Sequence, residues 1–456
     1  MTSLNTTHPH AFPAAAPHGG GASGHGTNHG DAGDAGGHDV APGDIAVGVV
    51  IGRASEYFDF FVFGIASALV FPSVFFPGES ALNGTLYAFA IFALAFVARP
   101  IGTVLSMAVQ RRWGRSTKLT LAMFLLGTCT AGIAFLPGYN SLGSTAVLLL
   151  ALFRIGQGMA LGGSWDGLPS LLAMNAPAKK RGWYAMLGQL GAPTGFVLAS
   201  ALFAYLYSSL SLEEFLAWGW RYPFFVAFAI NVVALFARLR LVVTREYEHL
   251  LEKSELEPVP ISELVSQQGG NVIIGAFAAL ASYALFHLVT VFPLSWTLLY
   301  AQQTIPSFLG VQILGGVLCA LAIVASGWLA DRYGRRNTLG TLALLIAVFS
   351  GFAPMLLGSG ASGQNIFILV GFVLLGLSYG QASGTVTSNF SSRYRYTGAA
   401  LTNDFAWLIG AAFAPLVALG LSAYFGLAYV GLYLLSGAAC TLGALLLNRK
   451  LETERD

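Results

Sequence analysis

The sequence predicts an all-α membrane protein with twelve transmembrane helices in two six-helix bundles. Of its 456 residues, 55% are hydrophobic and only 10% are charged, whereas soluble domains carry about 25% charged residues. Long charge-free stretches alternate with short polar ones, and a membrane-spanning helix needs about 20 apolar residues. A longer, glutamate-rich connection, residues 242–268, separates two sets of six such stretches.

Residues 1–43 differ in composition from the rest of the chain. They are rich in Gly, Ala, Pro and His and contain no Lys or Arg. We expect a disordered tail, because too few apolar side chains are present to form a core. The basic start and the apolar segment of a signal peptide are both missing. Six histidines lie here, His8, His10, His18, His25, His29 and His38; they can bind Zn²⁺ or Ni²⁺ weakly, but a solvated tail is the simpler interpretation.

From Asp44 onward, the apolar stretches account for the twelve helices in order. Residues 119–153 and 337–392 contain no Asp, Glu, Lys, Arg or His, and each stretch is long enough for two spans. The first is divided at Pro137-Gly138 and the second at Gly358-Ser359-Gly360. The break between the last two spans, near 420–426, is the least marked. The expected spans are residues 45–71, 81–107, 118–136, 144–170, 182–208, 221–241, 270–298, 306–330, 338–357, 364–389, 397–420 and 425–448.

The distribution of Lys and Arg indicates the orientation of the spans. With the N-terminus in the cytoplasm, 19 of the 23 basic residues fall in cytoplasmic loops or the C-terminal tail. The other four are Arg53, Arg99, Arg154 and Arg221. Such an excess marks the cytoplasmic side, so both termini are expected there. The central loop divides the membrane part into residues 44–241 and 269–448, and residues 449–456 form a short tail.

Sequence patterns of soluble enzymes are missing. There is no Gly-Lys dipeptide of a P-loop, no His-Glu-x-x-His and no Gly-x-Ser-x-Gly, so we expect neither an enzyme nor an ATP-driven pump, and no cofactor. A net charge of +2 argues against nucleic acid as a partner. Cys129, Cys319 and Cys440 each lie in an apolar stretch, so we expect them to pack rather than to form a disulfide or to bind a metal.

A short motif recurs at equivalent places in the two halves. The loop after the eighth span reads Gly327-Trp-Leu-Ala-Asp331-Arg332-Tyr-Gly334-Arg335-Arg336, and the loop after the second reads Gln110-Arg-Arg-Trp-Gly114-Arg115. Each contains a glycine turn with cations beside helix ends, where an acid can cap a helix or pair with a base. If these basic residues served only to orient the spans in the membrane, the arginines would be explained but the repeated glycine turn would not.

The pattern Gly-x3-Asp-Arg-x-Gly-Arg-Arg in a protein of six plus six helices resembles the major facilitator superfamily. Further motifs resemble its metabolite–proton symporter family, and together they cover nearly all of residues 44–448. They are Gly52-Arg53-Ala-Ser-Glu56-Tyr57-Phe58-Asp59-Phe60, Ala98-Arg99-Pro100-Ile101-Gly102, Arg154-x2-Gln157-Gly158-x3-Gly162-Gly163-x-Trp165, Gln189-x-Gly191-x3-Gly195 and Arg395-Tyr396-Thr397-Gly398.

Three positions depart from the family pattern. In the first-half loop Gln110 or Arg111 replaces the usual acid, and the spacing is one residue longer. In the fourth span Ser164 replaces a glutamate, and an acid stands instead at Asp166. Before Arg393, the acid–Phe–Pro of the family is replaced by residues 389–391, Asn-Phe-Ser. We therefore expect a rewired gating network.

The resemblance implies secondary active transport. We expect a proton-coupled symporter of the bacterial inner membrane that imports a small organic acid or related metabolite by alternating access. Its partners would be the substrate, protons and the lipid bilayer, and a monomer is expected. A proton-driven efflux antiporter is the alternative. A transporter-like sensor would need a cytoplasmic signalling domain, which is not evident, and metal delivery would rest on the histidine tail alone.

Seven ionisable residues are expected inside the membrane. Placing each charged side chain in the membrane costs about 2.5–3.5 kcal/mol on insertion scales, so its presence there indicates a structural or functional role. The candidates for proton coupling are Asp59, Glu56 and His287, because a carboxyl or imidazole group can take up a proton as its surroundings change. A permanent ion pair or a hydrogen-bonded core histidine is the structural alternative. The remaining four are Arg53, Arg99, Arg154 and Asp404.

Substrate binding is expected at guanidinium groups, which grip a carboxylate with two N–H donors. Arg154 and Arg53 are the candidates, and Arg154 is expected within reach of Asp59 in the central cavity of the superfamily. Polar groups on neighbouring spans complete the set, although such residues often only pair between helices. They are Gln157, Gln189, Tyr379 and Gln381.

Gating is expected at the repeated turn, through Asp331, Arg332 and Arg335, and at a second pair. Spans 2 and 11 face each other in the superfamily. Arg99 and Asp404 each lie roughly 11–12 Å from the cytoplasmic end of their helix at 1.5 Å per residue. Opposite charges at one depth relieve each other's burial cost, so we expect a latch between the halves.

Overall fold

The computed structural model describes residues 42–164, 177–242, 257–301, 303–384 and 390–448. Within these ranges, ten helices are long and apolar enough to cross a membrane. Two further spans complete the predicted twelve. One is α1 (Pro42–Leu69), which carries Arg53, Glu56 and Asp59, and the other arises because α3 (Ala81–Phe135) is broken into two at Gly114. The expected tail (apart from residues 42–43), most of the central linker and residues 449–456 lie outside the described residues.

The first half of the chain forms spans one to six. They are α1, the two parts of α3, α5 (Ser144–Gly163), α7 (Arg181–Leu187) with α8 (Gly191–Ser209), and α10 (Tyr222–Val242). Short helices connect them: α2 (Phe71–Phe75), α4 (Tyr139–Leu142), α9 (Leu212–Ala217), η1 (Ala178–Lys180), η2 (Gly188–Leu190) and η3 (Gly219–Arg221). α3 packs on α5 and α10, and α1 packs on α8 and α10, which makes one bundle.

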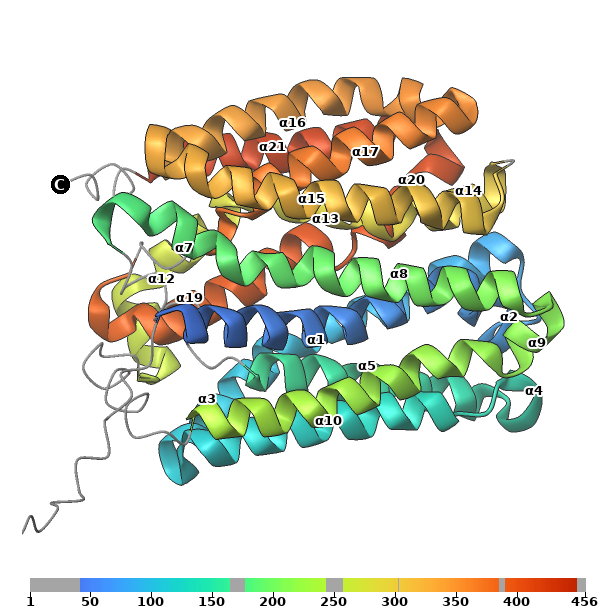
Figure 1. The fold of residues 1–456 in the computed structure, drawn as a ribbon, viewed down its shortest axis with the longest axis horizontal. Coiled ribbons are helices and arrows are strands. Elements are labelled where there is room, and N and C mark those ends of the chain that lie inside the picture. Colours follow the sequence, from blue (N-terminus) through green and yellow to red (C-terminus); the bar gives the residue numbers. More distant parts are fainter. Residues whose placement is uncertain (1–41, 165–176, 243–256, 302, 385–389, 449–456) are drawn as a thin grey trace, which may run out of the picture. The chain divides into compact units, whose positions relative to one another are not determined.

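The second half forms spans seven to twelve. They are α12 (Ile261–Ala278) with α13 (Leu280–Thr290) and α14 (Phe292–Tyr300), α15 (Ile305–Tyr333), α16 (Arg335–Gly358), α17 (Gly360–Tyr379), α19 (Ser392–Ala406) with η4 (Trp407–Ala411) and α20 (Ala414–Phe425), and α21 (Ala428–Leu447). The halves meet where α8 and α7 pack on α15, α14 on α1, and α19 on α3. Figure 1 shows α8 running beside α15.

The predicted spans are present, and most of their ends shift by a few residues. The largest shift is in the seventh span, which begins at Ile261, inside the expected linker 242–268, rather than at residue 270. The described part of α5 ends at Gly163 and that of the tenth span at residue 384, short of the expected 170 and 389, because the residues that follow lie outside the described ranges. The last break falls at Gly426, which has φ +96°. Gly420 was expected to end the eleventh span but continues the helix, since a turn needs the positive φ that Gly426 adopts.

Three spans are discontinuous, which the sequence did not predict. The fifth contains the 3₁₀ turn η2, the seventh is broken at Ala279 and Val291, and the eleventh contains the π-helical turn η4. A proline in the first turn of α14 and another in that of α20 account for two of the breaks, because proline has no N–H to continue the preceding helix. Broken spans give side chains and backbone groups access to the interior.

The repeated turn adopts the same backbone geometry in both halves. Gly114 has φ 86° and ψ 168°, and Gly334 has φ 85° and ψ 146°. Glycine is the residue that adopts such angles without strain. The internal repeat predicted from the two loops is therefore confirmed.

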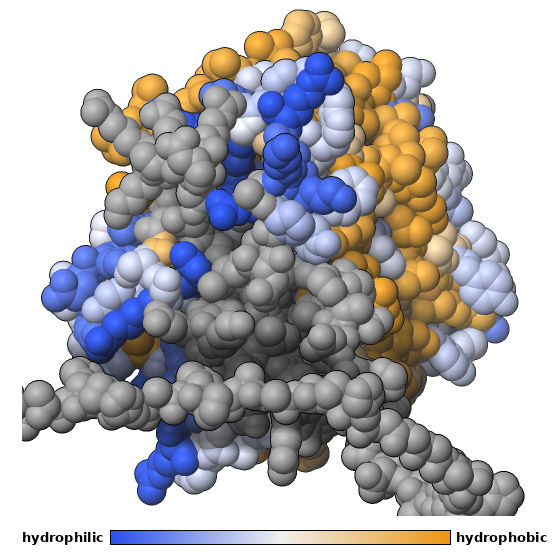
Figure 2. Space-filling view, turned by 60° about the vertical axis from the view of Figure 1, so that its left-hand side comes forward, coloured by the Kyte–Doolittle hydropathy of each residue, from blue (hydrophilic) through white to orange (hydrophobic). Residues whose placement is uncertain are grey.

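The surface separates an apolar flank from a polar end. Figure 2 shows hydrophilic residues gathered on the end that faces the viewer and hydrophobic residues along its flank. We call this the basic end, because the described chain there carries Lys179, Lys180, Arg332, Arg335 and Arg336. Large apolar side chains on the flank, such as Phe124, Val348 and Leu446, are more than half exposed. Such a surface suits contact with lipid.

Candidate functional site

A small cavity lies where α1, α3 and α5 of the first half meet η4 of the second. Its volume is about 30 Å³, which is room for roughly two water molecules, since one needs roughly 10–15 Å³ on this measure. The space between the halves at this point is therefore too small for an organic substrate. Charged groups of both signs and aromatic rings make up its wall: Arg53, Glu56, Tyr57, Phe60, Ala95, Phe96, Arg99, Leu161 and Trp407.

Arg53 and Glu56 form an ion pair within α1. Arg53 Nη1 lies 3.0 Å from Glu56 Oε2, as expected for residues three apart on one helix face. The side chain of Glu56 is 7% exposed and that of Arg53 is 20% exposed. Both line the cavity, so their charges are presented to whatever enters it.

Asp59 lies about one turn farther along α1 but not in the cavity wall. Its buried carboxylate accepts hydrogen bonds from Thr130 Oγ1 (2.6 Å), Asn231 Nδ2 (2.6 Å) and Gln157 Nε2 (3.0 Å). These donors lie on the third, sixth and fourth spans, so the carboxylate is enclosed by the first bundle. Three neutral donors satisfy it, and no described cation pairs with it directly.

Arg154 is joined to Asp59 only through Gln157. Its Nη1 donates to Gln157 Oε1 at 3.1 Å, and its Nε donates to the Phe92 carbonyl at 3.3 Å. The sequence predicted that Arg154 lies within interaction range of Asp59, which the link through Gln157 agrees with, and that both face the central cavity. The structure instead encloses both within the first half, since Phe60, which lines the cavity, covers the guanidinium at 5.3 Å from its ring centroid.

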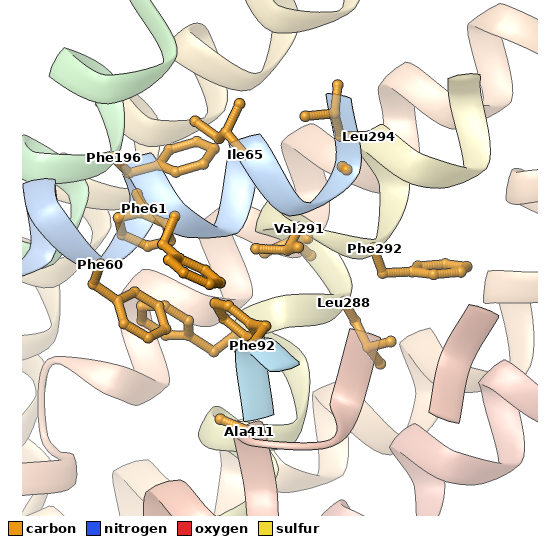
Figure 3. Packing of buried hydrophobic residues seen from close by; sticks show 14 of the residues in the cluster. Phe60, Phe61, Ile65, Phe92, Phe196, Leu288, Val291, Phe292, Leu294 and Ala411 are labelled. Atoms are coloured by element: carbon orange, nitrogen blue, oxygen red, sulfur yellow. The ribbon is translucent and has the colours of Figure 1, made fainter. Parts of the chain in front are cut away.

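His287 of α13 packs against aromatic rings of the other half. Its ring lies 5.4 Å from that of Phe60 and 5.2 Å from that of Phe92, between centroids. Its Nδ1 is 3.2 Å from Thr290 Oγ1, and its Nε2 has no hydrogen-bond partner among the described residues. Figure 3 shows Phe60 and Phe92 within the apolar layer between the halves. His287 is therefore part of this layer rather than of the cavity wall.

The expected pair of Arg99 and Asp404 is present. Arg99 Nε lies 2.7 Å from Asp404 Oδ1, and the hydroxyl of Thr103 donates to Asp404 Oδ2. Thr103 Oγ1 also lies 3.2 Å from the carbonyl oxygen of Gly162. Arg99 and Thr103 are on α3 and Asp404 is on α19, so these contacts join the two halves.

Tyr379 and Gln381 also connect the halves. The hydroxyl groups of Tyr379 and Tyr57 are hydrogen bonded, and Tyr57 lines the cavity. Gln381 Nε2 donates to the carbonyl of Gly182 at 3.3 Å and to Ser326 Oγ at 3.2 Å, which places it outside the cavity wall. Nearly buried in η2, Gln189 is also absent from that wall.

Asp331 of the repeated turn reaches across to the other half. Its carboxylate accepts hydrogen bonds from the backbone N–H groups of Gly182 (2.6 Å) and Trp183 (3.1 Å), at the start of α7. The carboxylate thus caps a helix of the first half, where negative charge is favourable. A Cβ on Gly182 would lie 2.8 Å from that of Ala330, so this approach needs glycine.

The described contacts of Arg335 and Arg332 are with residues of the second half. Arg335 Nη1 donates to the carbonyl of Gly384 at 3.1 Å. The Arg332 guanidinium lies 5.2 Å from the ring centroid of Trp328. Of the three gating candidates in the turn, Asp331 is therefore the one whose described contacts cross between halves.

Sequence reasoning missed several polar partners. Thr130, Asn231 and Thr103 hold the two buried carboxylates, and Tyr396 bonds Lys118 Nζ (2.9 Å) and Gln110 Oε1 (3.0 Å) between the halves. Asn231 gave a usable signal, because it interrupts an otherwise apolar sixth span. Asp166 and Asn389, two of the departures from the family motifs, lie outside the described residues.

No group of three His, Cys, Asp or Glu side chains able to hold a metal occurs among the described residues. The histidine tail falls outside them. Cys129, Cys319 and Cys440 are free thiols, and the first two are buried.

Comparison with known proteins identifies relatives of this chain. A family model described as Major Facilitator Superfamily matches residues 60–403. The chain is 37% identical over 416 residues to the inner membrane metabolite transport protein YhjE of Escherichia coli K12, covering 89% of this chain and 94% of that protein. It is 32% identical over 412 residues to the shikimate transporter of the same organism, covering 88% and 92%.

A solved structure shares the fold. The xylose transporter XylE from Escherichia coli, in a partially occluded inward-open conformation, superposes with a TM-score of 0.67 at 17% identity. The match covers 89% of this chain and 96% of that one. At this identity the likeness concerns the arrangement of helices and not the substrate.

Proposed function

Because the chain belongs to the major facilitator superfamily, and so is a multi-pass membrane transporter of metabolites, we propose that it is a proton-coupled symporter that imports a small organic acid. Transport would proceed by alternating access, with the two halves rocking about the cavity between them. The basic end would face the cytoplasm, which places both termini there. The membrane would be the bacterial inner membrane, as the name of one relative says of that protein, and the unit would be a monomer.

The cavity wall supports an anionic substrate. Two guanidinium groups, Arg53 and Arg99, face it beside a single lining acid, Glu56. Guanidinium groups bind carboxylates through paired N–H donors. Tyr57 and Trp407 add aromatic surface suited to a cyclic or otherwise apolar body. The carboxylate shikimate, in the name of one relative, has this combination of a ring and one negative charge.

Two acidic groups support proton coupling. Glu56 lines the cavity, where it is paired with Arg53 of its own helix. Asp59 is enclosed behind it by neutral donors and linked to Arg154 through Gln157, so one proton changes the net charge of that cluster. His287, on α13 of the second half, packs against Phe60 beside these groups, so a change in packing between the halves would alter its hydration.

Uptake into proteoliposomes tests the function. The protein is reconstituted with the interior buffered at neutral pH, and the exterior is made acidic or kept neutral. Labelled shikimate, benzoate, succinate and pyruvate are compared with glycine betaine and xylose. We expect accumulation of at least one carboxylate only under the inward proton gradient. Accumulation that requires the opposite gradient would establish an antiporter, and uptake of xylose or betaine alone would refute the anionic substrate.

A further inference from the structure

Arg99 stands between the cavity and Asp404. It contacts the Asp404 carboxylate through Nε, and no hydrogen bond of its terminal nitrogens is found within the described residues. Arg99 lines the cavity, whereas Asp404 is not in its wall and its side chain is only 3% exposed. The guanidinium therefore contacts an acid through Nε and belongs to a residue of the cavity wall, and its two terminal N–H₂ groups have no described hydrogen bond. This is the fork that binds a carboxylate.

The site is electrically balanced before a substrate enters. Arg53 pairs with Glu56, and Arg99 pairs with Asp404. A monoanionic substrate adds one negative charge to this small space between helices, and an uncompensated charge is costly to bury. Of the two acids, Glu56 keeps its neighbour on the same helix. Asp404 depends on a cation that the substrate would draw away.

We propose that a substrate carboxylate binds the terminal nitrogens of Arg99 and that Asp404 takes up one proton in exchange. The inference rests on the proposed function and assigns its coupling step. The Arg99–Asp404 ion pair breaks, an ion pair between Arg99 and the substrate forms, and one proton from water binds Asp404. The net charge of the site is unchanged, so one monoanion moves with one proton.

Thr103 is placed to accommodate the protonated acid. Its hydroxyl now donates to Asp404 Oδ2 and lies 3.2 Å from the carbonyl oxygen of Gly162. When Oδ2 carries a proton, that proton is donated to Thr103 Oγ1, and the threonine hydroxyl turns to donate to Gly162. Asp404 Oδ2 and the Thr103 hydroxyl thus each keep a hydrogen bond in either state, which lowers the free energy of both states.

Other ionisable groups do not replace Arg99. None of those on the helices around α19 contacts the Asp404 carboxylate within the described residues. Arg53 acts only from a distance, and Tyr283 donates to the neighbouring Asn403 at 3.0 Å. The groups on these helices include Arg53 of α1, Lys118 of α3, Glu263 of α12, and Tyr283 and His287 of α13.

The same exchange loosens the contact between the halves. Arg99 and Thr103 of α3 hold Asp404 of α19, and the π-helical turn η4 begins three residues later. π-helical turns often occur at functional sites, and Trp407, the first residue of this one, lines the cavity. Substrate and proton together would therefore release α19 from α3, and either alone would leave a buried charge unpaired.

Equilibrium binding at several pH values tests the proposal. Purified protein is titrated with labelled shikimate, or with whichever panel carboxylate the unaltered protein binds most tightly. We expect affinity to rise as the pH falls, by up to about tenfold per pH unit, because one proton binds with each anion. Asp404→Asn cannot take up that proton, so its affinity should not change with pH. In weakly buffered solution, a pH dye should report one proton taken up per anion bound by the unaltered protein.

Three variants serve as controls. Asp404→Glu keeps an ionisable acid and should restore the pH dependence. Arg99→Lys keeps the charge but loses the fork, so affinity should fall by about tenfold or more while its pH dependence remains. Glu263→Gln removes an acid whose partner Arg393, 2.7 Å away, also lies on α19 but outside the cavity, and it should leave binding unchanged.

The outcomes separate the two proposals. Unaltered protein that binds no carboxylate at any pH overturns the proposed substrate and this inference with it. Carboxylate binding that is independent of pH in the unaltered protein overturns the inference alone. The same holds if Asp404→Asn, folded by its elution profile, keeps the pH dependence of the unaltered protein.

Discussion

At the scale of single residues, the buried carboxylate of Asp59 can be replaced by an amide, which removes its charge while the protein still folds. In Asp59→Asn, the amide oxygen can still accept from Thr130 and Asn231, but the new N–H₂ group faces the N–H₂ of Gln157, whose oxygen accepts from Arg154. We expect a folded protein, with a loss of about 1–3 kcal/mol in stability, that exchanges substrate but no longer accumulates it. Uptake under a proton gradient and counterflow without one measure the two activities. Thr130→Val, which removes a hydrogen bond but no ionisable group, should keep accumulation.

Arg154 gives a different residue-scale prediction, because the structure moves it away from the cavity. Its guanidinium carbon lies 4.0 Å from the ring centroid of Phe63, and its Nη1 donates to Gln157. Lysine cannot make both contacts. Arg154→Lys should therefore lower the melting temperature, at a cost of about 1–3 kcal/mol, while leaving substrate affinity unchanged. A large loss of affinity at unchanged stability would return Arg154 to the substrate-binding role expected from the sequence.

The residues that sequence reasoning placed correctly share a simple geometry. Arg53 and Glu56 pair because they are three apart on one helix, and Arg99 and Asp404 because helix rise sets their depth. The contacts of Asp59 were not predictable in the same way. Which side chain meets it depends on how four helices rotate against one another, and neither spacing nor depth reports that rotation.

At the scale of elements, the number and order of spans followed from apolar length, but the breaks within them did not. The helix of the seventh span is interrupted at Ala279, where the sequence is apolar and contains no charged residue that would indicate a break. Such breaks depend on packing against neighbouring helices and on local hydrogen bonding, which hydropathy does not contain. The glycine turns are breaks that could be predicted, because the same loop motif occurs in both halves of the sequence.

Those turns give an element-scale prediction. Gly334 has φ 85° and ψ 146°, a conformation that costs a residue with a Cβ about 1–3 kcal/mol. Gly334→Ala should lower the melting temperature accordingly. Gly351→Ala is the matched control in the adjoining helix α16, where a Cβ meets nothing within 4 Å. It should raise stability slightly, by about 0.5–1 kcal/mol. Equal effects of the two substitutions would contradict a role for the turn geometry.

At the scale of the whole molecule, the described contacts between the halves gather at several levels. Asp331 caps α7 at the basic end, Gln381 bonds Gly182 beside it, and Arg99 pairs with Asp404 near the cavity. A transporter that alternates must break every contact on one side before that side opens. The free energy of closure is thus divided among several contacts between the halves. A single substitution can weaken one of these contacts without unfolding the protein.

Asp331→Asn tests that reasoning at the basic end. An amide accepts one of the two backbone N–H groups of α7 and turns its own N–H₂ toward the other, and the favourable charge at the helix N-terminus is lost. A weakening of about 1–2 kcal/mol should raise the open fraction by roughly 5–30-fold. The reporter is Met186→Cys, in protein whose three native cysteines are replaced, because Met186 is 1% exposed. Its labelling rate should rise in Asp331→Asn and should not rise in Glu263→Gln, an acid whose partner Arg393 belongs to its own half. An unchanged rate in Asp331→Asn would mean that this cap does not hold the basic end closed, and that closure there rests on the contacts of Gln381 and Tyr396 instead.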